Sequence, residues 1–172
     1  MDELRRIIRD VPDFPQKGIV FKDITPLLAH PEAFRKAIDL MAEPLRNREF
    51  DLLVGIESRG FIFAAALAYA LGKGEVPVRK PGKLPAKTVE ISYQLEYGSD
   101  RLEMHEDAIR VGQRVVIVDD VLATGGTARG VASLVEKVGG EVESFSFFIE
   151  LDFLKGREKL RGYDVRSVLS YR

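Results

Sequence analysis

The chain has no cysteine and no tryptophan, and only two of its 172 residues are histidine. Without cysteine it can form neither a disulfide bond nor a thiolate zinc site. Its longest apolar run, residues 61–71, is far shorter than the roughly 20 residues that cross a bilayer. Neither charge sign prevails, since 26 basic and 27 acidic side chains give a net charge of -1. We therefore expect a cytoplasmic protein that binds neither nucleic acid nor a membrane.

Length and composition indicate a single globular domain over residues 1–172, because 45% of the side chains are hydrophobic and can fill a core. Helical and strand patterns alternate along the chain without repeats or linkers. Strands are predicted at 52–56, 76–79, 114–118, 142–151 and 164–171, and helices near 1–11, 31–45, 61–71 and 128–138. This alternation predicts an α/β fold with a mostly parallel central sheet flanked by helices.

The bounds of two predicted helices depend on single residues. The N-terminal helix is expected to reach Val11, because Leu4, Ile7, Ile8 and Val11 would share one face. In the second helix, Pro44 is expected to end or kink the chain, because proline lacks the backbone N–H that a helix interior needs.

The most informative stretch is VVIVDDVLATGGT, residues 115–127. Its four β-branched residues, 115–118, are typical of a strand buried on both faces of a parallel sheet, and we expect that strand to end at Asp119 and Asp120. Because side chains alternate along a strand, the two carboxylates should point in opposite directions. Ligands of open α/β sheets bind beyond the carboxyl ends of the strands, so the chemistry is predicted at residues 119–127.

The loop after the acidic pair has the features of a phosphate site. It opens a predicted helix, whose first backbone N–H groups and dipole favour an anion. Gly125 and Gly126 allow close approach of the backbone, and Thr124 and Thr127 add hydroxyl donors. Carboxylates accept hydrogen bonds from vicinal hydroxyls, directly or through a hard cation. The stretch therefore predicts a site for a sugar phosphate.

The same stretch resembles the phosphoribosyl diphosphate (PRPP) motif of type I phosphoribosyltransferases. Five further blocks narrow the resemblance to the adenine phosphoribosyltransferase family and, with the first, span nearly the whole chain. They are VFKDITPLL (20–28), GIESRGFIF (55–63), RKPGKLP (79–85), SYQLEYG (92–98) and LKGREKL (154–160). The resemblance implies the type I fold, with a base-binding hood at about 1–30 and a mobile catalytic loop at about 84–106.

The resemblance also assigns the binding of PRPP to particular residues. The ribose is held by Asp119 and Asp120, and the 5-phosphate by Ala123, Thr124, Gly125, Gly126 and Thr127. The pyrophosphate is held by Glu57, Ser58, Arg59, Arg79, Lys80 and Lys83. Arg79 can act across a subunit interface in this family. A non-proline cis peptide is common at the pyrophosphate loop, and we predict it between Glu57 and Ser58.

Adenine recognition is likewise carried over from the family. Val20, Phe21 and Lys22 are expected to bind the base, with Phe21 stacked on the purine, and Val121 to contact the ring from its other face. Glu96 is the acidic residue expected near the purine, and Tyr97 is expected to cover PRPP and exclude water. LKGREKL is predicted to form a charged turn with an initial helix, and no role is assigned to it.

The implied reaction converts adenine and PRPP into AMP and pyrophosphate, with Glu96, Asp119, Asp120 and Arg59 as the catalytic residues. Mg²⁺ is the expected cofactor, held mainly by the substrate, and the expected assembly is a homodimer. Two alternatives stay open. A 6-oxopurine or xanthine phosphoribosyltransferase would share the PRPP loop, although VFKDI and SYQLEYG argue against it. A non-catalytic PRPP-sensing regulator would need a basic nucleic-acid surface, for which a chain of net charge -1 offers no basis.

Overall fold

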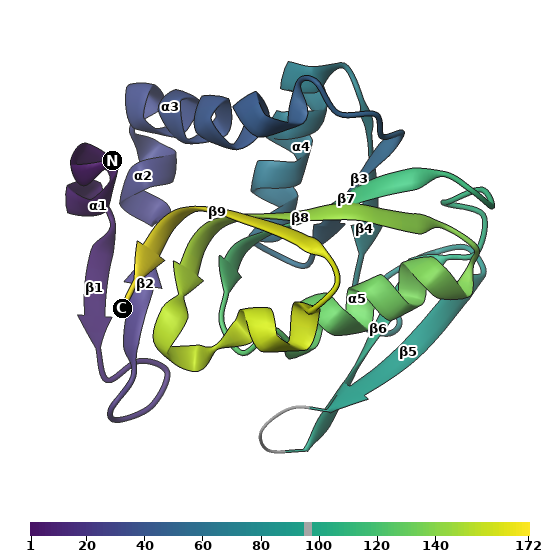
Figure 1. Cartoon of the computed structure of the whole chain (residues 1–172). Coiled ribbons are helices and arrows are strands. Elements are labelled where there is room, and N and C mark those ends of the chain that lie inside the picture. Colours follow the sequence, from purple (N-terminus) through teal and green to yellow (C-terminus); the bar gives the residue numbers. More distant parts are fainter. Residues whose placement is uncertain (95–97) are drawn as a thin grey trace. The chain divides into compact units, whose positions relative to one another are not determined.

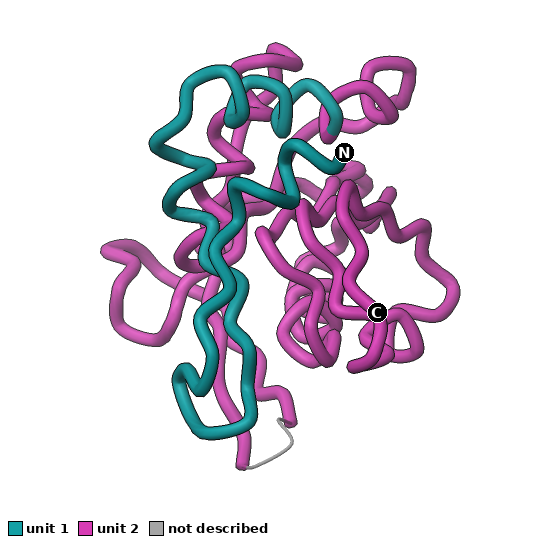
Figure 2. Tube along the Cα trace, turned by 90° about the vertical axis from the view of Figure 1, so that its left-hand side faces the viewer, with its two compact units in different colours: residues 1–40 teal, residues 41–172 magenta. Residues whose placement is uncertain are grey.

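The structure is a computed structural model that describes residues 1–94 and 98–172. The chain divides into two compact units, Met1–Leu40 and Met41–Arg172 (Figure 2). No helix within these described residues is long and apolar enough to cross a membrane.

The first unit contains a two-stranded antiparallel sheet and short helices. Its elements are α1 (Asp2–Ile7), β1 (Arg9–Pro12), β2 (Val20–Asp23), α2 (Thr25–Ala29) and α3 (Pro31–Ala42), the last of which crosses the unit boundary. The prediction of a helix as far as Val11 is wrong. Val11 lies on β1, where it pairs with Phe21 of β2, and this backbone pairing ends the helical pattern after Ile7.

The second unit is built on a five-stranded parallel sheet with the order β4-β3-β7-β8-β9 (Figure 1). The strands are β3 (Leu52–Ile56), β4 (Gly74–Val78), β7 (Arg114–Leu122), β8 (Glu141–Leu151) and β9 (Asp164–Tyr171). Helices α4 (Gly60–Leu71) and α5 (Gly126–Lys137) follow β3 and β7. The remaining elements are a hairpin of β5 (Thr88–Gln94) and β6 (Ser99–His105), and the 3-10 turns η1 (Glu43–Leu45), η2 (Asp152–Leu154) and η3 (Gly156–Leu160). The predicted fold class is confirmed.

Helices cover both faces of this sheet because its strands are apolar on both sides. On one face Val131 and Leu134 of α5 pack in a core cluster that includes Phe145 and Phe147 of β8. On the other face Phe63 of α4 stacks on Phe148, with ring centroids 5.4 Å apart. Figure 1 shows α4 and α5 on opposite sides of the strands. Within the sheet β3 and β7 are paired in parallel, so their carboxyl ends lie at the same edge of the sheet.

The central strand is longer than predicted. β7 continues through the acidic pair to Leu122, because Asp119 and Val121 still pair with Phe147 and Ile149 of β8. The expected end at the first aspartate is therefore wrong, and the carboxylates lie within the strand. The predicted end of the second helix near Pro44 is confirmed, since α3 ends at Ala42 and the chain continues as η1.

Candidate active site

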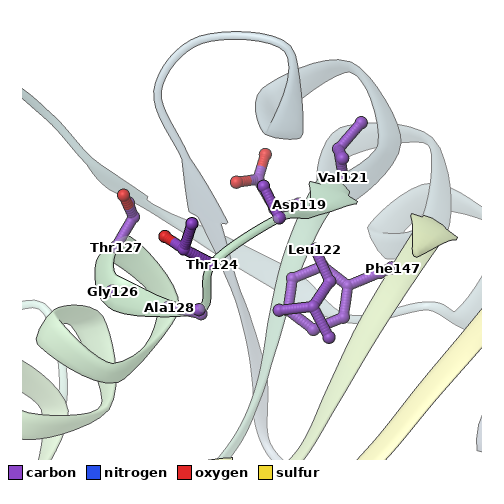
Figure 3. Close-up of a pocket in the computed structure, with 10 residues that line it drawn as sticks. Asp119, Val121, Leu122, Thr124, Gly126, Thr127, Ala128 and Phe147 are labelled. Carbon is purple, nitrogen blue, oxygen red and sulfur yellow. The ribbon is translucent and has the colours of Figure 1, made fainter. Parts of the chain in front are cut away.

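Asp119 lies in a pocket at the carboxyl end of β7 (Figure 3). The pocket has a volume of about 80 Å³, and its other walls are Val121, Leu122, the loop Ala123–Thr127, Ala128 and Phe147. The Asp119 Oδ1 atom accepts a hydrogen bond from the backbone N–H of Asp120 at 2.9 Å, which fixes the orientation of the carboxylate. The acidic side chain and the predicted phosphate loop therefore line one cavity.

Asp120 has a different environment, as the alternation of side chains predicts. It is only 4% exposed, and its Oδ2 lies 2.8 Å from Nε of Arg59, the residue that precedes α4. The buried carboxylate of Asp120 thus forms an ion pair with the half-buried Arg59 that joins the end of β7 to the loop after β3.

The pKa of each carboxyl is raised. For Asp119, burial is the main cause and the negative charge of Asp120 adds to it, so its pKa lies well above the ordinary value. For Asp120, burial raises the pKa and the guanidinium of Arg59 opposes this change. The positive charge of Arg59 therefore acts on both carboxyls, and a ligand that brings a further positive charge would be attracted to this point.

The loop Ala123–Thr127 leads into α5, as the sequence predicts. Gly125 precedes α5 with a φ of 79°, in the left-handed region that glycine adopts freely. The first N–H groups of α5, at Gly126, Thr127 and Ala128, have no acceptor within the helix and face the same pocket end. This arrangement can hold an anion with several oxygen atoms.

The loop after β3 adjoins the acidic pair. The Glu57–Ser58 peptide bond is cis, as predicted. A Cβ atom added to Gly60 would lie 2.8 Å from Oδ1 of Asp119 and 3.0 Å from the carbonyl oxygen of Val118. Only glycine fits there, so the backbones at the exits of β3 and β7 lie against each other.

The predicted basic cluster gathers around Glu57. Nε of Arg79 lies 3.2 Å from the carboxylate, the backbone N–H of Lys80 donates to it at 2.9 Å, and the ammonium of Lys83 donates to it as well. Burial alone would raise the pKa of Glu57, but the bonds from Lys83, Lys80 and Arg79 hold it below its ordinary value. The cluster is therefore already organised around one anion.

Two residues that the sequence analysis leaves unassigned join the site from the hairpin. Asp100 of β6 accepts a hydrogen bond from the ammonium of Lys80, and Tyr93 of β5 lies between them and the loop, with its hydroxyl 3.4 Å from Asp100 and 3.5 Å from Oγ1 of Thr127. The pairing of Tyr93 with Asp100 in the hairpin creates this chain. No spacing in the sequence reveals that register, so neither residue could be predicted.

The predicted adenine-binding residues of the first unit lie on β2. Val20 is 47% exposed, and the ring of Phe21 meets that of Phe14 edge-on, with centroids 5.2 Å apart. The Lys22 ammonium donates to Asp10 at 2.6 Å. Glu96 and Tyr97 lie outside the described residues.

Known proteins with similar sequences and structures are phosphoribosyltransferases. Residues 23–169 match the model of the phosphoribosyl transferase domain family. An adenine phosphoribosyltransferase of Thermotoga maritima is 63% identical, and the alignment covers 98% of each chain. The crystal structure of adenine phosphoribosyltransferase from Thermoanaerobacter pseudethanolicus has a TM-score of 0.97 at 57% identity, covering 99% of both chains.

A second solved structure adds ligands. The adenine phosphoribosyltransferase of Saccharomyces cerevisiae, complexed with an imino-altritol bisphosphate and adenine, has a TM-score of 0.91 at 44% identity and covers 98% of this chain and 97% of its own. The chain belongs to the phosphoribosyl transferase domain family and, within it, to the adenine phosphoribosyltransferases.

Proposed function

We propose that the chain transfers the 5-phosphoribosyl group of PRPP to adenine and releases AMP and pyrophosphate, a reaction of purine salvage. The observation that carries this proposal is the shared cavity of Asp119 and the loop Ala123–Thr127, next to the loop that bears Arg59. A carboxylate for a sugar and a helix N-terminus for a phosphate thus stand beside a cluster of cations. The names of the relatives, all adenine phosphoribosyltransferases, support adenine as the acceptor.

The roles follow from the position of each group. The N–H groups and threonine hydroxyls of residues 123–127 hold the 5-phosphate, and Asp119 accepts hydrogen bonds from the ribose hydroxyls. Arg59 binds the pyrophosphate together with the loop residues Glu57 and Ser58 and the cluster formed by Arg79, Lys80 and Lys83. Asp120 orients Arg59 through the 2.8 Å ion pair and adds negative charge below the ribose.

Catalysis depends on the charge that develops during the transfer. As the bond from the anomeric carbon to the pyrophosphate oxygen breaks, the ribose becomes cationic before the purine nitrogen bonds to it. Fixed carboxylates stabilise this cation more than the neutral sugar, and so they lower the barrier. A positive charge on the ribose would oppose the two effects that raise the pKa of Asp119, burial and the negative charge of Asp120.

Mg²⁺ is the proposed cofactor. Within residues 1–94 and 98–172, no three acidic or histidine side chains converge on one point. The ion would therefore take its ligands from the hydroxyls and pyrophosphate of PRPP and from water, a set that Mg²⁺ accepts, and would contact the protein only indirectly. When bound, the ion neutralises the departing pyrophosphate.

Adenine binding is proposed from the family resemblance. Val20, Phe21 and Lys22 contact the base, with the Phe21 ring stacked on the purine, and Val121 contacts the ring as well. Glu96 is proposed to lie near the purine and Tyr97 to cover PRPP. We also propose a cytoplasmic homodimer. Its support is the outer face of α4, which is apolar throughout and exposes Ile62 by 40% and Tyr69 by 93%.

One assay tests the activity. The protein is incubated with Mg²⁺, PRPP and one purine base at a time: adenine, hypoxanthine, guanine or xanthine. We expect AMP from adenine and at most trace nucleotide from the other three. Nucleotide formed from a 6-oxopurine but not from adenine would reassign the base, and absence of product and of calorimetric heat with PRPP would refute the proposal.

A further inference from the structure

The segment η3, Gly156–Leu160, passes directly behind the phosphate loop. A Cβ atom added to Gly156 would lie 2.3 Å from the carbonyl oxygen of Ala123, and one added to Gly125 would lie 2.4 Å from the carbonyl oxygen of Gly156. No side chain fits at either position, so the two backbones are in direct contact. Gly156 therefore forms the rear support of the loop that opens α5.

Arg157 holds this support in place. Its guanidinium donates two hydrogen bonds to Glu150 of β8, from Nε to Oε1 at 2.6 Å and from Nη2 to Oε2 at 2.7 Å. A third bond runs from Nη1 to the carbonyl oxygen of Val165 on β9, at 2.7 Å. Glu150 is only 5% exposed and also accepts a bond from the hydroxyl of Ser167 at 2.6 Å. Such a bidentate pair fixes both distance and orientation.

The pair also lies close to the start of the loop. Glu150 is opposite Leu122 in the pairing of β8 with β7, and Leu122 is the residue before Ala123. Leu160, at the other end of η3, is 1% exposed and belongs to the core of the second unit. The segment is thus anchored on both sides of its contact with the loop, by an ion pair near one end and by apolar packing at the other.

We propose that Arg157 and Glu150 are positioning residues for the phosphate loop: they press Gly156 against Gly125 and Ala123 and thereby fix the loop in the conformation that receives the 5-phosphate. This inference rests on the proposed role of residues 123–127 as the 5-phosphate site. It assigns a function to the block LKGREKL, in which Gly156 supplies the contact and Arg157 the anchor.

The ion pair of Arg157 with Glu150 supports only the loop that is proposed to bind the 5-phosphate end of PRPP. The pyrophosphate loop, residues 57–60, follows β3, whereas η3 contacts the loop after β7. Loss of Arg157 would leave the buried carboxylate of Glu150 without its main partner, and the segment would move to restore hydration. Binding of the 5-phosphate should therefore weaken while binding of pyrophosphate is preserved.

The test compares Arg157→Met and Arg157→Lys with the wild type, and with Glu158→Ala as a matched control at an exposed position of the same turn. Calorimetry measures the Kd of ribose 5-phosphate and, separately, of Mg²⁺ pyrophosphate. For Arg157→Met we expect about a tenfold rise in the Kd of ribose 5-phosphate and in the KM of PRPP, equivalent to about 1.4 kcal/mol. The Kd of pyrophosphate, the KM of adenine and kcat at saturating PRPP should stay within about twofold.

The other variants define how the proposal can fail. Arg157→Lys keeps the charge but loses the bidentate contact with Glu150, so it should retain part of the affinity for ribose 5-phosphate that Arg157→Met loses. Glu158→Ala should resemble the wild type. Equal loss of ribose 5-phosphate and pyrophosphate binding, or a lower kcat with unchanged KM, would show a general structural role and overturn the proposal.

A second variant keeps the proposal testable if Arg157→Met does not fold. Gly156→Ala retains the ion pair but places its methyl group against Ala123, and it should cause the same selective loss. In a double variant the two effects should be less than additive, because both displace the same loop; full additivity would contradict the coupling. A wild type that does not bind ribose 5-phosphate would refute the proposed phosphate site itself, whereas wild-type affinity in all variants would refute only this inference.

Discussion

Asp119 and Asp120 are adjacent in the chain but differ in what each can do. Asp119 lines the cavity with the phosphate loop, whereas Asp120 is paired with Arg59. The sequence predicts this divergence, because consecutive side chains of a strand point in opposite directions. It could not predict which aspartate meets Arg59, because that contact depends on how the loop after β3 lies against β7.

Asp120→Asn should separate catalysis from folding. The amide keeps the shape of the side chain but removes the negative charge that is proposed to act on the ribose, and it removes the ion pair with Arg59. We expect turnover to fall by about 10²-fold, comparable to the loss of one charge-stabilising group in an active site. Stability should change by only about 1 kcal/mol, because Arg59, with a side chain 33% exposed, can be hydrated.

The measurements are steady-state kinetics and denaturant unfolding, with Asp39→Asn at an exposed position of α3 as the control. Unchanged turnover in the Asp120→Asn protein would contradict its role.

The raised pKa of Asp119 predicts a pH dependence of stability with a definite sign. Its pKa is higher in the folded chain than in the unfolded chain because burial, and then the charge of Asp120, disfavours the ionised form. The folded state therefore binds more protons, and this group lowers stability as the pH rises from its ordinary value of about 3.9 through the raised value. Asp119→Asn should remove this penalty.

Thermal unfolding of both proteins between pH 4 and pH 8 checks the prediction. The variant should have a higher Tm than the wild type at neutral pH, a smaller advantage at pH 4 and a lower kcat throughout. A Tm below that of the wild type at neutral pH would show that the ionised carboxylate stabilises the fold.

The β5–β6 hairpin is connected to the site through α5. Gly130 of α5 leaves room for the side chain of Tyr93. A Cβ atom at Gly130 would lie 3.1 Å from Cγ of Tyr93 and 3.2 Å from its Cβ and Cδ1 atoms. Tyr93 in turn reaches toward Thr127 and Asp100. The position of the hairpin therefore depends on the absence of one methyl group from a neighbouring helix.

Gly130→Ala should reveal this dependence. In an unconstrained helix the substitution stabilises by about 1 kcal/mol, but overpacking costs typically about 1 to 3 kcal/mol. We therefore expect no gain in Tm, together with a higher KM for PRPP as the hairpin shifts. In a Tyr93→Ala background, where the ring is absent, Gly130→Ala should raise Tm relative to the Tyr93→Ala protein. A stabilised Gly130→Ala protein with unchanged KM would show that the contact has no consequence.

Apolar patterns predicted the elements of the sheet better than those of the first unit. The strands at 52–56, 142–151 and 164–171 and the helix after residue 60 could be predicted because buried parallel strands and their helices are continuously or periodically apolar. The helical assignment of Val11 and the predicted end of the strand at the acidic pair were wrong, because an apolar pattern does not show which segments pair. Val11 lies on a strand that depends on pairing with the distant Phe21, and the extension of β7 through the acidic pair depends on pairing with β8.

The full chain of 172 residues could be assigned to its family from six blocks, because together they span nearly the whole chain. The contacts that join the blocks could not be predicted. Lys80 with Asp100, and Gly156 with Gly125, are brought together by strand register and by backbone packing. The sequence predicts only a charged turn for LKGREKL, because the buried partner of Arg157, Glu150, lies on a separate strand, β8.

Self-association is predicted from α4. This helix has no charged residue between Gly60 and Leu71, although Ile62 and Tyr69 are exposed. Burial of such a face in a dimer would remove apolar area from water. Tyr69→Glu should shift the protein to a monomer in light scattering, whereas Lys73→Glu, just beyond the helix, should not. A monomeric wild type would contradict the proposed homodimer.

The pairing of β3 with β7 limits the length of the sugar that can lie between the loops after these strands. These neighbouring parallel strands lead into residues 57–60 and 123–127, the two loops proposed to bind the phosphate groups, and strands in a sheet lie about 4.8 Å apart. The distance between the loops is thus set by hydrogen bonds between the two backbones and not by the side chains of the loops. Changing a side chain in either loop should weaken the grip on a pentose without making room for a longer carbon skeleton.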